Sequence, residues 1–275
     1  MTRSQQPGVT LFAAGMIGLG ILALVCGDFA LGWQPVAPWV PGRTGLAYLS
    51  GALMLLCGAG LMFRAAAAWS ARILFPYLIV WTLLKVPALI VAPKIEGVWL
   101  GFGELAVLLA GGWVLFARFS EIPEASPLGF ASGERGVRIA RILFGVWLLP
   151  IGLSHFVYVK ETIDLVPAWL PFRVGWGYLT GAGHIACGLA VLLSIVPRLA
   201  AMAEAGMIFL ITLLVWAPAI AAAPATRLPW TAFLISWIIA AAAWVVAQEI
   251  PAKRSGDPAM QPEHGRDSRD AQGTE

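Results

Sequence analysis

The chain has 275 residues, of which 59% are hydrophobic and only 12% are charged, and its net charge at pH 7 is +3. Soluble globular chains carry about a quarter charged residues, so this composition argues against an ordinary soluble domain and predicts helices that face hydrocarbon. The small net charge, with no basic cluster between aromatic residues, excludes nucleic acid as a partner.

Eight apolar segments follow one another along the chain, each close to the roughly 20 residues that cross a hydrocarbon layer about 30 Å thick. They predict a polytopic, all-α membrane protein with eight transmembrane helices embedded in a lipid bilayer. The first segment is too long for the apolar core of a signal peptide, and no cleavage site of small residues follows it. The predicted spans are residues 9–31, 45–63, 71–92, 98–117, 138–158, 174–195, 199–223 and 229–248.

A polar stretch rich in Pro, Gly and Ser separates the fourth span from the fifth. We therefore expect a first four-helix membrane repeat in residues 1–119, a cytoplasmic linker in 120–136 and a second four-helix repeat in 137–249. Residues 250–275 are almost free of apolar side chains and predict a disordered tail. Most Lys and Arg residues lie in the N-terminus, the linker, the tail and the connections on that side, which favours cytoplasmic termini.

The two halves of the chain resemble each other in sequence at an offset of about 130 residues. The motif from Trp39 to Ala52 recurs from Trp169 to Ala182, and Cys57-Gly58 recurs as Cys187-Gly188. Because each unit has an even number of helices, the copies enter and leave on the same side. The repeat is therefore parallel, with its pseudo-symmetry axis along the membrane normal.

Ionisable residues inside a membrane are candidates for function because hydrocarbon disfavours them. Lys85 and Glu104 lie equally far from the turn between the third and fourth spans, so they are expected at the same depth. Three interpretations stay open: a structural ion pair, a proton or anion site, and pairing of Lys85 with Asp28 instead. Glu204 lies near the start of the seventh span, where it is expected to pair with Arg198 at the interface.

Two histidines are candidates for a ligand or proton site. His184 shares a helical stripe with Gly177, Gly181 and Gly188, and small residues line tight helix contacts in membranes, so it should point into the bundle. It is either a buried neutral histidine bonded to a neighbour such as a Thr or Tyr, or part of a haem, quinone or proton-relay site. His155 ends the fifth span, aligned with Asp28, and is expected about 10 Å from His184 in depth, which argues against a haem held by both.

The three cysteines, Cys26, Cys57 and Cys187, form no CxxC pair, and we find no sequence motif for a metal site. The outer connections contain clusters of Pro and Trp, at residues 35–41 and 167–171. Such clusters act either as anchors in the headgroup layer or as a lid over an outward-facing pocket.

The second half contains Tyr178-Leu-Thr-Gly-Ala-Gly-His-Ile-Ala-Cys-Gly-Leu, then Arg198-Leu-Ala-Ala, then Leu213-Leu214 and Pro218-Ala219. In these motifs it resembles the DoxX-like family of small bacterial membrane proteins, as the first half also does more weakly. The resemblance implies a four-helix bundle in the bacterial cytoplasmic membrane and a link to quinone or thiol redox pathways, with quinone as the candidate cofactor. Family members typically carry Glu near the start of the second helix, where this chain has Met54 and His184.

Three functions remain open on this reading. The first is a redox-linked component that works with a membrane or periplasmic redox partner and uses His184, His155 and Lys85. The second is a transporter for a small solute or proton, with Lys85, Glu104 and Asp28 on its path. The third is a non-catalytic protein that assembles or stabilises a membrane complex.

Overall fold

The structure, a computed structural model, describes residues 6–123 and 125–251. Over these residues the fold is all-α, as predicted, with no strand. The helices are α1 (Pro7–Cys26), α2 (Arg43–Met62), α3 (Arg64–Leu83), α4 (Val86–Val91), α5 (Glu96–Phe119), the 3-10 helix η2 (Gly129–Ala131), α6 (Gly133–Val157), α7 (Val159–Leu165), α8 (Arg173–Leu192), α9 (Pro197–Ile211), the π-helix η3 (Thr212–Trp216), α10 (Ala217–Ala222) and α11 (Arg227–Gln248).

Seven helical stretches of the described chain are long and apolar enough to cross a membrane. Two of them combine shorter elements, because α3 and α4 together form Arg64–Val91, and α9, η3 and α10 together form Pro197–Ala222. The sixth predicted span corresponds to α8, which has 20 residues but contains several glycines as well as Arg173 and His184. Large apolar side chains are exposed over much of the surface, as helices that face hydrocarbon require.

Helix ends differ from the predicted spans where polar or capping residues decide them. The first helix ends at Cys26 rather than at residue 31, because Gly27 adopts a left-handed φ of 59° and closes it. In contrast, α3 begins at Arg64 and α6 begins at Gly133, earlier than residues 71 and 138. The hydropathy pattern marks the apolar part of a helix, and a helix can continue beyond that part through polar residues.

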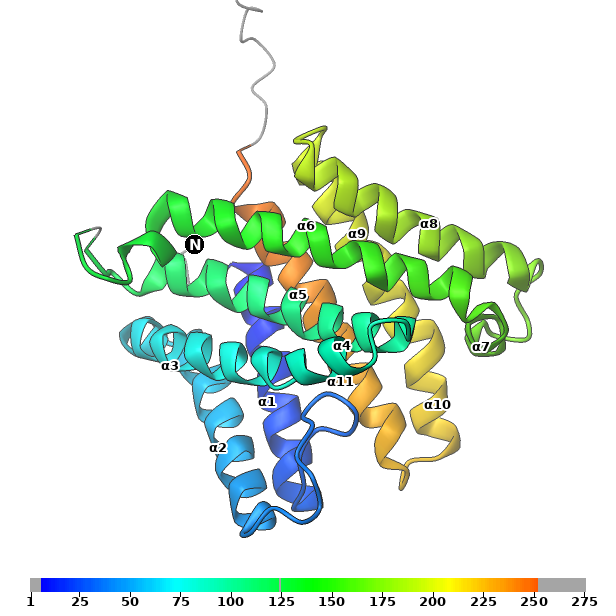
Figure 1. The fold of residues 1–275 in the computed structure, drawn as a ribbon, viewed down its shortest axis with the longest axis horizontal. Coiled ribbons are helices and arrows are strands. Elements are labelled where there is room, and N and C mark those ends of the chain that lie inside the picture. The colour runs from blue at the N-terminus through cyan, green and yellow to red at the C-terminus, as the bar shows by residue number, and fades with distance from the viewer. Residues whose placement is uncertain (1–5, 124, 252–275) are drawn as a thin grey trace, which may run out of the picture.

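Neighbouring helices pack in chain order within each half. Thus α1 contacts α2, α2 contacts α3 and α3 contacts α5, while α6 contacts α8, α8 contacts α9 and α9 contacts α11. Between the halves, α1 packs on α11, α6 packs on α5, and α5 packs on α11. Figure 1 shows α3, α5 and α6 running across the view and α1 and α2 running down it. The most buried spans are α5 and α11, and Gly111 and Ala242 lie in close contact between them.

Two of the long helices are interrupted just before a proline. Proline has no N–H to donate, and its ring crowds the carbonyl four residues earlier. Accordingly, α3 ends at Leu83, two turn residues follow, and α4 begins at Val86 with Pro87 in its first turn. In the other half the π-helix η3 precedes Pro218, and such a bulge is a common way to accommodate a disturbed helix. The first of these breaks determines where Lys85 lies.

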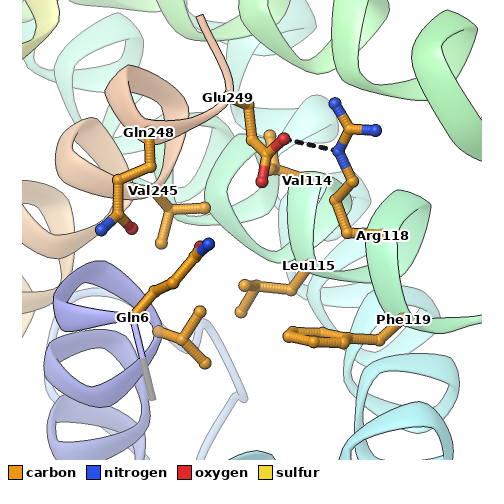
Figure 2. Close-up of a pocket in the computed structure, with 9 residues that line it drawn as sticks. Gln6, Val114, Leu115, Arg118, Phe119, Val245, Gln248 and Glu249 are labelled. Carbon is orange, nitrogen blue, oxygen red and sulfur yellow. Dashed lines mark ion pairs between the residues drawn. The ribbon is translucent and has the colours of Figure 1, made fainter. Parts of the chain in front are cut away.

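The N-terminal end of α1 and the C-terminal ends of α5 and α11 lie together around one small pocket (Figure 2). Gln6, Gln248 and Glu249 line a small pocket there together with Arg118, whose Nε lies 2.6 Å from Glu249 Oε2. Arg118 also contacts Glu134 at the start of α6, at 2.7 Å. The first and last helices therefore have these ends on the same side of the fold.

The predicted linker is held against the helices. The indole of Trp113 donates to the carbonyl of Ala131 at 3.0 Å, and the guanidinium of Arg72 donates to the carbonyl of Ser120. The tail predicted for residues 250–275 lies outside the described residues except for its first two.

Candidate functional site

A buried histidine–carboxyl pair joins α8 and α9 in the second half. His184 Nδ1 lies 2.7 Å from Glu204 Oε1, and the side chains are only 1% and 0% exposed. The predicted pairing of Glu204 with Arg198 at the interface is therefore wrong. His184 is buried and bonded to a neighbouring side chain, as expected, but this neighbour is a carboxyl group rather than a Thr or Tyr. Ala200, Ala201, Ala205 and Glu204 all lie on the buried face of α9, which brings the carboxyl group inward.

His155 from α6 lies beside this pair. Its ring centroid is 5.1 Å from the ring centroid of His184, so the predicted separation in depth is wrong. His155 Nδ1 lies 3.0 Å from the carbonyl oxygen of Ile151, and a carbonyl can only accept a hydrogen bond. In this geometry Nδ1 carries the hydrogen, and Nε2 of the neutral ring holds the lone pair.

Glycines explain how the two histidines meet. A Cβ at Gly152 of α6 would lie 2.6 Å from the carbonyl oxygen of Gly181, and a Cβ at Gly181 of α8 would lie 2.7 Å from His155 Cβ. Such distances are open only to glycine, so the two backbones approach closely here, as small residues allow in membranes. Because the backbones of α6 and α8 are so close, the side chains of His155 and His184 on neighbouring turns reach each other.

The arrangement can hold and exchange a proton. An imidazole and a carboxyl group at 2.7 Å share one proton, and the pair has no net charge either as His⁺–Glu⁻ or with both groups neutral, which lets it stay buried. Glu204 Oε2 is buried and has no hydrogen-bond partner among the described residues. His155 Nε2 and Glu204 Oε2 are therefore two acceptors for a further hydrogen. The thiol of Cys187, one turn beyond His184, lies beside Glu204.

The structure does not bring the other candidates to this site. Lys85 lies in the break between α3 and α4, where its Nζ donates to the carbonyl of Gly32 at 2.7 Å. The same Nζ lies against Gly101, one turn before Glu104 on α5, so Lys85 and Glu104 face each other through space. Among the described residues they form no ion pair within 4.0 Å, so the first of the three interpretations, a structural ion pair, does not hold.

Asp28 belongs to a third group of charges, outside the spans. Its carboxylate contacts Arg43 at the start of α2 and lies 2.8 Å from Arg227 at the start of α11. Burial by itself would raise the pKa of Asp28, but Arg227, the N–H of Phe29 and Arg43 outweigh it, and the pKa falls below its ordinary value. Asp28 therefore ties the α1–α2 loop to the second half and is not paired with Lys85.

Sequence reasoning missed the partner of His184. The signal that was available is a lone carboxylate among alanines on the inward face of an apolar helix. Within the described residues, no three His, Cys, Asp or Glu side chains are close enough to hold a metal ion. A haem between His155 and His184 would need space between their rings, and the rings are in contact.

A family model described as a domain of unknown function, DUF8561, matches residues 144–245. This segment covers well under half of the chain, and it contains His155, His184 and Glu204. No match was found among curated proteins or among solved structures.

Proposed function

We propose that the chain is a tandem duplication of a DoxX-like four-helix unit, in which α8 also crosses the membrane and brings the number of transmembrane helices to eight. Hydrogen bonds that recur at an offset of 130 or 131 residues support the duplication. Three side-chain donors of the first half have counterparts in the second. Arg43 Nε donates to Val36 O as Arg173 Nε donates to Val166 O. Likewise, the hydroxyls of Thr82 and Thr212 donate to Leu78 O and Ile208 O, and the indoles of Trp99 and Trp230 donate to Pro93 O and Pro224 O. The helix contacts of the first half also recur in the second.

We further propose that both termini lie in the cytoplasm of a bacterium, with the helices in its inner membrane. Gln6, Arg118 and Glu249 line the same small pocket, which supports an even number of crossings in each half. The charge pattern of the connections supports the orientation.

The proposed function is that of a redox-linked membrane component that exchanges protons at the His184–Glu204 pair. The observation that carries it is the fully buried pair at 2.7 Å with the ring of His155 beside it. Buried ionisable groups inside a membrane mark proton relays and ligand sites. Quinone chemistry couples two electrons to two protons, and a membrane or periplasmic partner would supply the electrons.

The side chains present are compatible with a quinone. Quinone oxygens exchange hydrogen bonds with neighbouring groups, and imidazoles can donate and accept them. His155 is the member of the cluster that is partly exposed, next to the exposed Phe156. It would therefore contact a quinone that arrives from the bilayer, and the buried pair behind it would exchange the protons.

The two halves differ at this site. Ala23 faces Gly51 in the first half as His155 faces Gly181 in the second, so Ala23, rather than Asp28, takes the place of His155. Met54 and Leu74 stand at the positions of His184 and Glu204, and both are buried. This supports one proton site per chain.

The test is to purify the protein in mild detergent, record its absorption spectrum before and after dithionite, and extract bound quinone. We expect stoichiometric quinone in the wild type and its loss in His184→Ala and in the isosteric Glu204→Gln, with Trp230→Phe as control. A colourless wild-type protein without quinone would contradict the proposal that the chain binds a redox cofactor. Proton-flux and pull-down assays would then separate a transporter from a non-catalytic assembly protein.

A further inference from the structure

Three arginines follow one another along the first turns of α6, at the opposite end of this helix from His155. Arg135, Arg138 and Arg141 lie three residues apart, so they form a column on one side of the helix. Arg135 and Arg138 are exposed, and Arg141 is partly exposed. Within the described residues, none of the three forms an ion pair within 4.0 Å. Their guanidinium groups are therefore available to an anion.

The acidic residue that precedes the column is already engaged by a different arginine. Glu134 lies at the start of α6, and its Oε1 lies 2.7 Å from the guanidinium of Arg118 at the end of α5. The three arginines of the column also outnumber this one carboxylate. The column therefore keeps an excess of positive charge.

The same face of α6 continues as an exposed apolar stripe. Ile142, Val146 and Leu153 lie seven, eleven and eighteen residues after Arg135, and these spacings return to one face of a helix. Their side chains are 48%, 40% and 49% exposed, as expected for side chains that contact acyl chains in a bilayer. One continuous surface would thus contact both the headgroup and the acyl chains of a phospholipid.

The full arginine column is not a feature of the repeated unit. Gly20 of α1 and Gly152 of α6 make the same close contact with the helix that follows, which aligns α1 with α6 at an offset of 132 residues. Gln6 and Val9 then stand where the last two arginines of the column are. Because the first half forms the same helix contacts without these two charges, the fold does not require them, and this favours a role in binding.

We propose that the start of α6 binds an anionic phospholipid, with Arg135 and Arg138 on its phosphate and Ile142 along its acyl chains. Arginine presents its N–H donors in a planar fork and can contact phosphate with two of them at once. Basic clusters beside membrane-spanning helices attract anionic lipids. The apolar stripe points to a lipid as the source of the phosphate, because a free anion would gain nothing from it. The inference depends on α6 lying in a membrane and is independent of the proton site.

The test titrates the full chain, solubilised in mild detergent, with two phospholipids that have identical acyl chains. Native mass spectrometry measures the dissociation constant of the first lipid bound, for anionic phosphatidylglycerol and for zwitterionic phosphatidylcholine. We expect phosphatidylglycerol to bind about 25-fold more tightly, since each of two arginines contributes about fivefold at an anionic surface. Glycerophosphoglycerol, which is the headgroup without acyl chains, should not bind in the same concentration range.

Variants tie the binding to the arginine column. Arg135→Gln and Arg138→Gln should each weaken the binding of phosphatidylglycerol about fivefold, and the double variant should bind both lipids equally. The matched control is Arg64→Gln, because Arg64 is an exposed arginine at the start of α3, in the other half but on the side proposed to be cytoplasmic. It should change nothing. Circular dichroism verifies that each variant is folded.

Three outcomes would overturn the inference that the column binds an anionic lipid. The wild type could fail to distinguish the two lipids, or the double variant could keep the preference for phosphatidylglycerol. Arg64→Gln could also weaken binding as much as Arg138→Gln does, which would show that only the net charge matters. Binding of glycerophosphoglycerol as tight as that of the lipid would show a site for free anions instead.

Discussion

His184 Nδ1 and Glu204 Oε1 lie 2.7 Å apart, with both side chains almost entirely shielded from solvent. A buried pair of this kind is costly to break because the remaining group keeps its charge or its unsatisfied hydrogen bond, whereas replacing both members by apolar residues is often neutral or stabilising. The first half of the chain has Met54 and Leu74 at the corresponding positions.

We predict that His184→Met and Glu204→Leu each destabilise the protein by roughly 3–5 kcal/mol, because each leaves one buried group without a partner. The double variant should unfold at or above the wild-type temperature. Thermal unfolding in detergent, followed by circular dichroism, is measured for the wild type, the two single variants and the double variant, which together form a double-mutant cycle. Additive effects of the two substitutions would contradict the pairing.

The contact between α6 and α8 should be sensitive to a single methyl group. In Gly152→Ala the new Cβ would lie 2.6 Å from the carbonyl oxygen of Gly181, so the helices must separate. We expect a loss of about 1–3 kcal/mol in unfolding free energy and a change at His184 in histidine NMR spectra. Gly206→Ala is the matched control, since nothing lies within 4 Å of its Cβ, and it should be neutral or slightly stabilising.

The Asp28 contacts should show a defined dependence on pH. The pKa of Asp28 is lowered in the folded protein from an ordinary value of 3.8, so its ion pairs stabilise the fold above that value. The stabilisation is lost as the pH falls through the folded pKa. Asp28→Asn should therefore cost on the order of 1 kcal/mol at pH 7 and progressively less below about pH 4.

The unfolding midpoints of Asp28→Asn and the wild type should converge in acid, measured in the same detergent. Arg227→Met should give a similar loss at pH 7, since it removes the cation that lies 2.8 Å from this carboxylate. A deficit in Asp28→Asn that stays constant down to pH 2 would show that the carboxylate's charge is not what matters.

Lys85 should restrain the α1–α2 loop. Lys85→Met removes the donor to the Gly32 carbonyl, and a loop with fewer restraints opens more often. Amide hydrogen exchange in residues 28–42 should become up to about tenfold faster, as expected for one lost hydrogen bond. Lys160→Met changes an exposed lysine elsewhere and should leave the loop unaffected; equal exchange in both variants would refute the restraint.

The sequence by itself determined the all-α class of the chain and its helices that are long and apolar enough to cross a membrane. Charged residues are too few for a soluble surface, and apolar runs of about 20 residues form helices because hydrocarbon leaves the backbone no other partner for its hydrogen bonds. It also indicated that His184 points inward, because small residues such as the glycines of its stripe line tight helix contacts in membranes. These features are local, and periodicity and composition report them directly.

Only the tertiary structure decided which polar groups meet. His184 and Glu204 lie on different helices, and counting residues along straight spans placed His155 too far from them. The glycine contact between α6 and α8 brings the histidines together, and Lys85, in the break before Pro87, donates its hydrogen bond to the α1–α2 loop rather than to Glu104. Pairing of buried polar groups depends on helix crossing, helix rotation and local breaks, which act over a few ångströms and leave no periodic pattern in the sequence.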